Sequence, residues 1–385
     1  MSPLSLPARR RNVRPVVDGL ESRELLNAAP VVAAQVSRTS GQEMSQESIV
    51  GQLVKPSLTV STVPTKGPAR GDQNPYGVAF VPSDFPQGGP LQPGDVLVSN
   101  FNNSKNVQGT GTSIVRITPD GQQSVFFTSK EPGLSTALGV LEDGFVIVGN
   151  VPITDGTFST IRQGSLQVID RFGDQVLKLT DPKLLDGPWD LTINDQGTTA
   201  QVFVSNVISG TVTRIDLSVF PSQDSVKVLD MTQIASGYTV TPNASAVVLG
   251  PTGLAFDPRT DTLYVASTGD NAIYAIGNAA FTSSDGGQGK LIFSDANHLN
   301  GPLGLVLAPN GDLVTTNGDA FNPASNVPPS ELVEFTPEGR FVAEFSIDAV
   351  AGSAFGIALG RSGDHLILAA VDDNFSQLDL FQVND

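Results

Sequence analysis

PTGLAFDPRTDTLYVASTGDNAIYAI, from Pro251 to Ile276, contains three short apolar runs separated by turn-forming residues. The first run begins with Pro-x-Gly, and TLYVAS and AIYAI follow it at short intervals. Asp, Arg, Asn and Gly separate the runs, and such residues terminate strands and form tight turns. The stretch therefore predicts three consecutive antiparallel strands.

The same unit recurs along the chain from Asn74 onward. Its first strand reads PYGVAF, ALGVLE, PWDLTI, PTGLAF, PLGLVL and AFGIAL, and five copies also have a fourth strand. Four short strands in each unit of roughly 50 residues are typical of a β-propeller blade. The sequence therefore predicts an all-β protein, a six-bladed β-propeller. We call the third residue of each first strand the anchor; the six predicted anchors are Gly77, Gly139, Asp190, Gly253, Gly304 and Gly356.

The last copy ends after its third strand, at Val383. Upstream of the first copy, SLTVSTV from Ser57 to Val63 alternates as a strand does. We expect this amino-terminal strand to complete the last blade, because pairing there would remove the open sheet edges of a linear array.

Glycine at the anchors has a steric explanation, since inner strands that converge on a central channel require close backbone approach. Asp190 is the one predicted anchor that is not glycine, and it follows Trp189, the single tryptophan. Trp189 is interpreted as a packing group between blades or as a stacking surface for a ligand. Asp190 is interpreted as a local turn hydrogen-bonding group or as a functional acid.

Composition excludes several classes of function. The chain has no cysteine and two histidines, so thiolate chemistry and a histidine-rich metal site are excluded. The formal net charge of the chain is −17. Residues 1–38 have a net charge of +3, so the remainder has a net charge of −20. So acidic a body repels phosphate backbones, which argues against nucleic acid as a partner. No stretch approaches the ~18 apolar residues of a transmembrane segment.

Residues 1–48 are predicted to be a mostly disordered export or sorting segment with a polar linker, and residues 49–385 the propeller. LESRELL, from Leu20 to Leu26, resembles the LEPR-XLL motif of large exported proteins of planctomycete-type bacteria, with Ser22 in place of the usual proline. The resemblance implies an extracellular or cell-surface protein. A short amphipathic helix with no sorting role is the alternative.

The repeat resembles the NHL-type and gluconolactonase-type six-bladed propellers over about four-fifths of the chain. In gluconolactonase-like enzymes the resemblance implies Asn or Asp metal ligands directly before the anchor. None of the residues at those positions is an amide or a carboxylate: Tyr76, Leu138, Trp189, Thr252, Leu303 and Phe355. Streptogramin-lyase-like propellers would require paired histidines, and His298 and His365 are isolated from each other.

Polar residues end five of the six second strands on the face where the first strands begin. Four of the five are asparagines, namely Asn100, Asn150, Asn206 and Asn317, and Asp319 follows shortly after the last of them; Ser267 ends the fifth strand, and the second strand of the last copy is predicted to end at Ala370. Long inserts fall largely on the same face, where binding usually resides. The asparagines are interpreted either as turn-forming residues or as a ligand or cation site, whose oxygen donors would suit calcium.

The leading hypothesis is a non-enzymatic exported propeller that binds a protein, peptide or glycan through this loop-rich face. Its predicted binding residues are Asp190, Asn100, Asn150, Asn206, Asn317, Asp319 and Trp189. The alternative is a divalent-metal (calcium-type) dependent hydrolase or lactonase with a rearranged ligand set, in which Asp190 and Asn206 are the candidate ligands. Whether the protein is an enzyme stays open at this point.

Overall fold

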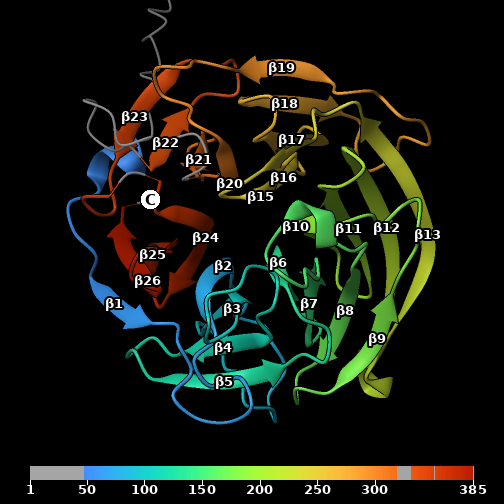
Figure 1. The fold of residues 1–385 in the computed structure, drawn as a ribbon, viewed down its shortest axis with the longest axis vertical. Coiled ribbons are helices and arrows are strands. Elements are labelled where there is room, and N and C mark those ends of the chain that lie inside the picture. Colours follow the sequence, from blue (N-terminus) through green and yellow to red (C-terminus); the bar gives the residue numbers. More distant parts are fainter. Residues whose placement is uncertain (1–46, 319–330, 351, 385) are drawn as a thin grey trace, which may run out of the picture. The chain divides into compact units, whose positions relative to one another are not determined.

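The computed structural model describes residues 47–318, 331–350 and 352–384. In these residues six four-stranded antiparallel sheets surround a central channel (Figure 1), so the predicted six-bladed propeller is confirmed. The LESRELL motif and Asp319 lie outside the described residues. None of the helices in the described ranges is long and apolar enough to cross a membrane.

Each blade begins with its inner strand and ends with its outer strand. Blade 1 contains β2 (Gln73–Phe80), β3 (Val96–Asn102), β4 (Ser113–Ile117) and β5 (Gln123–Thr128). Blade 2 contains β6 (Leu134–Leu141), β7 (Phe145–Asn150), β8 (Ser165–Asp170) and β9 (Gln175–Leu179). Blade 3 contains β10 (Pro188–Asp195), β11 (Thr199–Asn206), β12 (Thr211–Phe220) and β13 (Ser225–Ser236).

The remaining blades follow the same order. Blade 4 contains β16 (Pro251–Asp257), β17 (Thr262–Ser267), β18 (Ala272–Gly277) and β19 (Lys290–Phe293). Blade 5 contains β20 (Pro302–Leu307), β21 (Leu313–Asn317), β22 (Leu332–Phe335) and β23 (Phe341–Phe345). Blade 6 contains β24 (Ala354–Ser362), β25 (His365–Asp372), β26 (Gln377–Val383) and β1 (Leu58–Ser61). The elements outside the blades are η1 (Val50–Gln52), η2 (Phe158–Thr160), η3 (Pro221–Gln223) and the hairpin of β14 (Thr241–Asn243) with β15 (Val247–Leu249).

The amino-terminal strand closes the ring as predicted. β1 pairs antiparallel with β26, from Leu58 opposite Leu380 to Ser61 opposite Gln377. Leu58 and Val60 pack against the apolar side chains between blades 6 and 1. The first and last strands of the propeller therefore belong to one sheet.

Residues just before β1 attach the chain to blade 5 through Glu334, which is fully buried in β22. Its carboxylate accepts hydrogen bonds from the Ser48 hydroxyl (2.5 Å) and from the backbone N–H groups of Ile49 (3.1 Å) and Val50 (2.8 Å). Asn310 donates a further bond of 2.9 Å. A buried carboxylate is costly unless such donors surround it, so this attachment fixes the segment that leads into β1.

Anchor glycines allow neighbouring inner strands to approach each other closely. A Cβ atom on Gly356 would lie 1.9 Å from the Tyr76 carbonyl oxygen, and one on Gly253 would lie 2.4 Å from the Leu303 carbonyl oxygen. These distances are far shorter than van der Waals contact, which confirms the steric explanation for these anchors.

Blade 2 requires a correction, because its anchor is Ala137 rather than Gly139. In blade 1, Val78 pairs with Val98 of the second strand, and the anchor Gly77 directly precedes it. In blade 2 the equivalent pair is Leu138 with Val148, and the residue that directly precedes Leu138 is Ala137. The methyl group fits there because the facing residue on β7 is Gly149, where a Cβ atom would lie 2.7 Å from that of Ala137. Asp190 is therefore one of two anchors that are not glycine.

The two faces of the ring differ. We call the face where inner strands begin and second strands end the loop face, and the opposite face, where inner strands end, the turn face. In blade 6 the second strand ends at Asp372 rather than at Ala370, because Asp372 pairs with Ala354 just as Asn100 pairs with Pro75 in blade 1. An acid, not an alanine, therefore occupies the asparagine position of blade 6.

Candidate functional site: the central channel

Large apolar side chains fill the channel at the loop face. We call Tyr76, Phe101, Trp189, Leu303 and Phe355 the plug; each is at most 8% exposed. The Tyr76 and Trp189 rings lie 5.9 Å apart although they come from blades 1 and 3, which are not adjacent, so their contact spans the channel. Trp189 thus packs as an apolar group, and its indole Nε1 has no hydrogen-bond partner among the described residues.

Long loops of the loop face meet over the plug. Val151, Ile153, Val247 and Val248 belong to the same apolar cluster as the plug. The Gln108 side chain, on a loop of blade 1, donates a hydrogen bond of 2.6 Å to the Ser245 carbonyl, on the connection between blades 3 and 4. The described loops of blades 1 and 2 and the connection between blades 3 and 4 therefore cover the plug at this end of the channel.

Beyond the plug the channel is hollow, and we call this space the channel cavity. It measures about 340 Å³, and all six inner strands line it, from the anchors toward the turn face. Plug residues are buried, whereas the side chains at the turn-face ends of the inner strands are partly exposed. These end residues are Phe80, Val140, Ile193, Phe256, Leu307 and Leu359. The channel cavity therefore opens on the turn face and is closed on the loop face.

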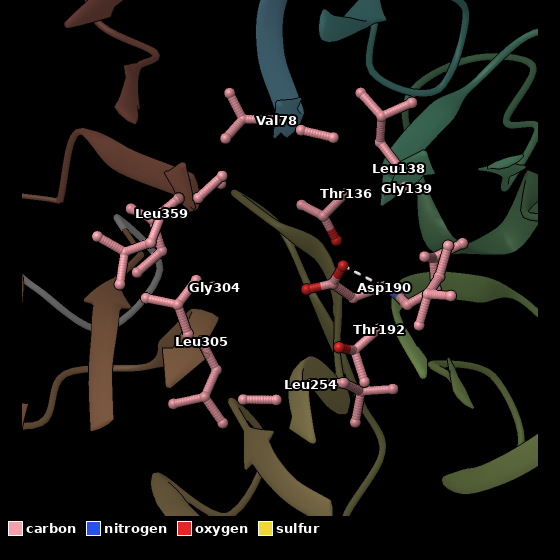
Figure 2. Close-up of a pocket in the computed structure, with 18 of the residues that line it drawn as sticks. Val78, Thr136, Leu138, Gly139, Asp190, Thr192, Leu254, Gly304, Leu305 and Leu359 are labelled. Carbon is pink, nitrogen blue, oxygen red and sulfur yellow. Dashed lines mark hydrogen bonds between the residues drawn. The ribbon is translucent and has the colours of Figure 1, made fainter. Parts of the chain in front are cut away.

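Asp190 lies at the closed end of the channel cavity, beside Thr136 and Thr192 (Figure 2). One carboxylate oxygen accepts a hydrogen bond of 2.8 Å from the Leu191 backbone N–H. The Asp190 backbone N–H bonds the Ser205 hydroxyl at 3.1 Å, as Gly77 and Gly304 bond hydroxyls of their own second strands. The local hydrogen bond foreseen for Asp190 is thus present, and no side-chain donor among the described residues reaches its carboxylate.

The environment of Asp190 favours its protonated form. Solvent reaches the side chain only through the channel cavity, and protein atoms surround it. This desolvation raises the pKa of the Asp190 carboxyl well above its usual value, and the Leu191 hydrogen bond offsets only part of the rise. A neutral carboxyl can donate a hydrogen bond, which a carboxylate cannot.

Each of the four predicted asparagines links the second strand of its blade to the connection that enters the inner strand of the same blade. Each Nδ2 group donates to a backbone carbonyl of that connection. The pairs are Asn100 with Thr62 (2.9 Å), Asn150 with Pro132 (3.0 Å), Asn206 with Leu184 (3.2 Å) and Asn317 with His298 (2.8 Å). The amides therefore have a repeated structural role on the loop face.

The described residues do not fit a calcium site in the channel. The oxygens of Asn150 and Asn206 already accept bonds from the Ser165 hydroxyl (2.6 Å) and the Asp186 N–H (3.1 Å). Asp190 is the only carboxylate among the described residues that line the channel cavity, whereas calcium takes six to eight oxygen ligands and commonly several carboxylates. No group of three or more His, Cys, Asp or Glu side chains in the described ranges could hold a metal ion.

Thr136, Thr192 and Phe101 were not singled out from the sequence. The shifted anchor of blade 2 placed Leu138 rather than Thr136 directly before the anchor position. Phe101 follows Asn100 at the end of a strand, and only the three-dimensional packing of its ring on Tyr76, with centroids 4.4 Å apart, reveals its place in the plug.

Fold and site together define a six-bladed propeller whose channel is closed at one face and carries one acid. No family model matches the chain, and no curated protein matches its sequence. Solved structures with a similar backbone include the allergen Mala s 1 of Malassezia sympodialis, with 15% identity over 81% of this chain and 96% of that chain and a TM-score of 0.49.

Two further structures with similar backbones have been named as enzymes. The periplasmic gluconolactonase PpgL of Pseudomonas aeruginosa has 16% identity over 83% of this chain and 87% of its own, with a TM-score of 0.45. A putative oxidoreductase (glucose dehydrogenase) of Thermus thermophilus has 14% identity over 84% and 98%, with a TM-score of 0.47. These similarities concern the backbone and give no argument about activity.

Proposed function

We propose that the protein binds a small, uncharged and largely apolar molecule in the channel cavity. The observation that carries this proposal is an open hollow, lined by aliphatic side chains and by polar backbone groups, with one acid of raised pKa at its closed end. Apolar pockets with a few convergent polar groups are the usual form of small-molecule sites.

The polar groups define the chemistry of the ligand. Protonated Asp190 would donate a hydrogen bond to a carbonyl oxygen of the ligand, with the Thr136 and Thr192 hydroxyls beside it. None of the described residues that line the channel cavity is Lys, Arg or His, so a negatively charged group would find no counterion among them. A ketone, an ester or a lactone fits these requirements.

Binding of 2-hexanone, a carbonyl compound that only accepts hydrogen bonds, tests the proposal. Affinity should be constant at low pH and fall about tenfold as pH rises through the raised pKa of Asp190, because the ionised carboxylate cannot donate. Calorimetry and quenching of Trp189 fluorescence measure it. Asp190→Asn, which stays neutral, should bind with a flat pH profile, whereas the exposed control Asp230→Asn should keep the wild-type profile. Equal binding by wild type and Asp190→Leu would contradict the proposal.

A divalent-metal-dependent hydrolase or lactonase is the second candidate, because Asp190 faces the channel at a position where four of the six blades have glycine. The single carboxylate argues against its metal site. We therefore expect calcium to leave the melting temperature unchanged. A rise with calcium that Asp190→Asn abolishes would favour this candidate over the binding protein.

The loop-face partner and the location of the protein stay proposals of their own. A protein, peptide or glycan would bind the outer surface of the loop-face connections, above the plug. Export would place the propeller outside the cell or on its surface. Cell fractionation of the full-length chain and of a chain lacking residues 1–46 tests this, and the same cytoplasmic distribution of both would contradict it.

A further inference from the structure

A second hollow lies next to the channel cavity on the turn face, between blade 6 and blade 1. It measures about 320 Å³, and we call it the radial cleft. Its walls come from the turn-face ends of strands in both blades and from β1, the closing strand. Six of the lining residues are Leu58, Asp120, His365, Ile367, Leu380 and Gln382.

Phe80 lines both the channel cavity and the radial cleft. A Cβ atom on Gly360 would lie 2.2 Å from the Cγ atom of the Phe80 ring, so this ring packs directly against the backbone of β24. Phe80 is itself partly exposed. The two hollows are therefore neighbours on one face, with the Phe80 side chain as their common wall.

The chemistry of the radial cleft continues that of the channel cavity. Leu58, Ile367 and Leu380 supply aliphatic surface, and Asp120 and Gln382 supply polar groups near solvent. None of the described residues that line either hollow is Lys or Arg, and His365 of the radial cleft is exposed and hydrogen-bonded to Gln382. The same uncharged, apolar chain would suit both.

We propose that the radial cleft binds the distal part of the molecule held in the channel cavity, so that the ligand is a long-chain aliphatic carbonyl compound. The inference rests on the proposed function and adds the shape of the ligand. Its carbonyl lies at Asp190, its chain crosses Phe80 at the mouth, and its tail occupies the radial cleft.

Chain length is the variable that tests this inference. The strand from Asp190 to Ile193 spans about 10 Å, so 2-hexanone ends within the channel cavity and 2-dodecanone extends beyond its mouth. Each methylene group that becomes buried should raise affinity by up to about fourfold. In the full-length protein, 2-dodecanone should therefore bind far more tightly than 2-hexanone, as measured by calorimetry.

Ser57 and Ser362 line the radial cleft and are at least partly exposed, so larger side chains there should fill it without disturbing the core. Ser57→Phe and Ser362→Phe, each tested as a single substitution, should leave the affinity for 2-hexanone unchanged. Each should lower the affinity for 2-dodecanone by about tenfold or more. Ser124→Phe, at an exposed position on β5 that lines neither hollow, should retain the whole gain.

The outcomes separate the two proposals. If 2-hexanone binds through Asp190 but 2-dodecanone gains nothing in the wild type, or gains equally in both cleft variants, the long-chain inference is overturned and the proposed function stands. If neither ketone shows Asp190-dependent binding, the proposed function is overturned and this inference with it.

Discussion

A chain that begins at Val63 is expected to be largely unfolded at physiological temperature, so that heating it from there shows no cooperative unfolding transition. This truncation removes β1 and the segment before it, including the buried Ile49, Val50 and Leu53 and the packed Leu58 and Val60. Burial of such a side chain stabilises a fold by about 1.5–3 kcal/mol, so the five together approach ~10 kcal/mol. Whole domains are stable by only ~5–15 kcal/mol. Calorimetry and circular dichroism measure the loss.

The truncation also removes three of the four hydrogen-bond donors of Glu334, namely the Ser48 hydroxyl and the Ile49 and Val50 N–H groups, and so takes away the attachment to blade 5. A chain that begins at Glu47 is the matched control and should melt as the full-length protein does. A synthetic peptide of residues 47–62 should restore part of the lost stability in trans. An unchanged melting temperature for the shorter chain would mean that β1 does not close the ring.

Trp189→Ala should lower the free energy of unfolding by about 3–5 kcal/mol, because it removes the largest ring of the plug and leaves a cavity. Trp189 is 2% exposed and lies 5.5 Å from Phe101, ring centre to ring centre. The same change should connect the channel cavity to the loop face and weaken ligand binding at Asp190. Urea unfolding followed by circular dichroism measures the stability change.

Phe281→Ala is the control for this substitution, because Phe281 is an aromatic residue that is 77% exposed. Its effect should stay within about 0.5 kcal/mol. If Trp189→Ala were as mild as Phe281→Ala, the plug would not be a packed structure.

Blade number and ring closure could be predicted because both depend on short sequence patterns. Turn residues and short apolar runs recur in every copy, and Ser57 to Val63 alternates as an edge strand does. Steric demand at Gly253 and Gly356 comes from the inner strand of the next blade, and because this contact repeats around the ring it leaves a glycine in most copies. Such features depend on the backbone of one blade and its neighbour, so a single sequence reveals them.

The anchor of blade 2 was predicted two residues away from its true position because a glycine, Gly139, happened to follow the expected pattern. At the true anchor, the space that the Ala137 methyl group needs is provided by Gly149 on the next strand. Neither strand read alone shows that the two residues face each other.

The site was harder to predict than the fold. The asparagines on the loop face do recur, but an amide side chain suits turn formation, hydrogen bonding to the backbone and metal binding equally well. Only the atoms that it contacts in the structure show which of these roles it has. Asp190 was correctly placed among the inner strands. The closing of its channel at the loop face depends on loops of blades 1, 2 and 3 meeting over the plug, which no repeat pattern encodes.

The pairing of β1 with β26 also constrains the order in which the protein can fold during synthesis. Thr59 and its partner Asp379 are separated by 320 residues along the chain. During synthesis β1 must therefore wait until β26 has been made, and contacts of such long range make folding slow. Until Val383 has been made, β1 and the incomplete sixth blade both expose unpaired edges of the kind that promote aggregation. Nascent chains should depend on protection from aggregation until β26 has been made.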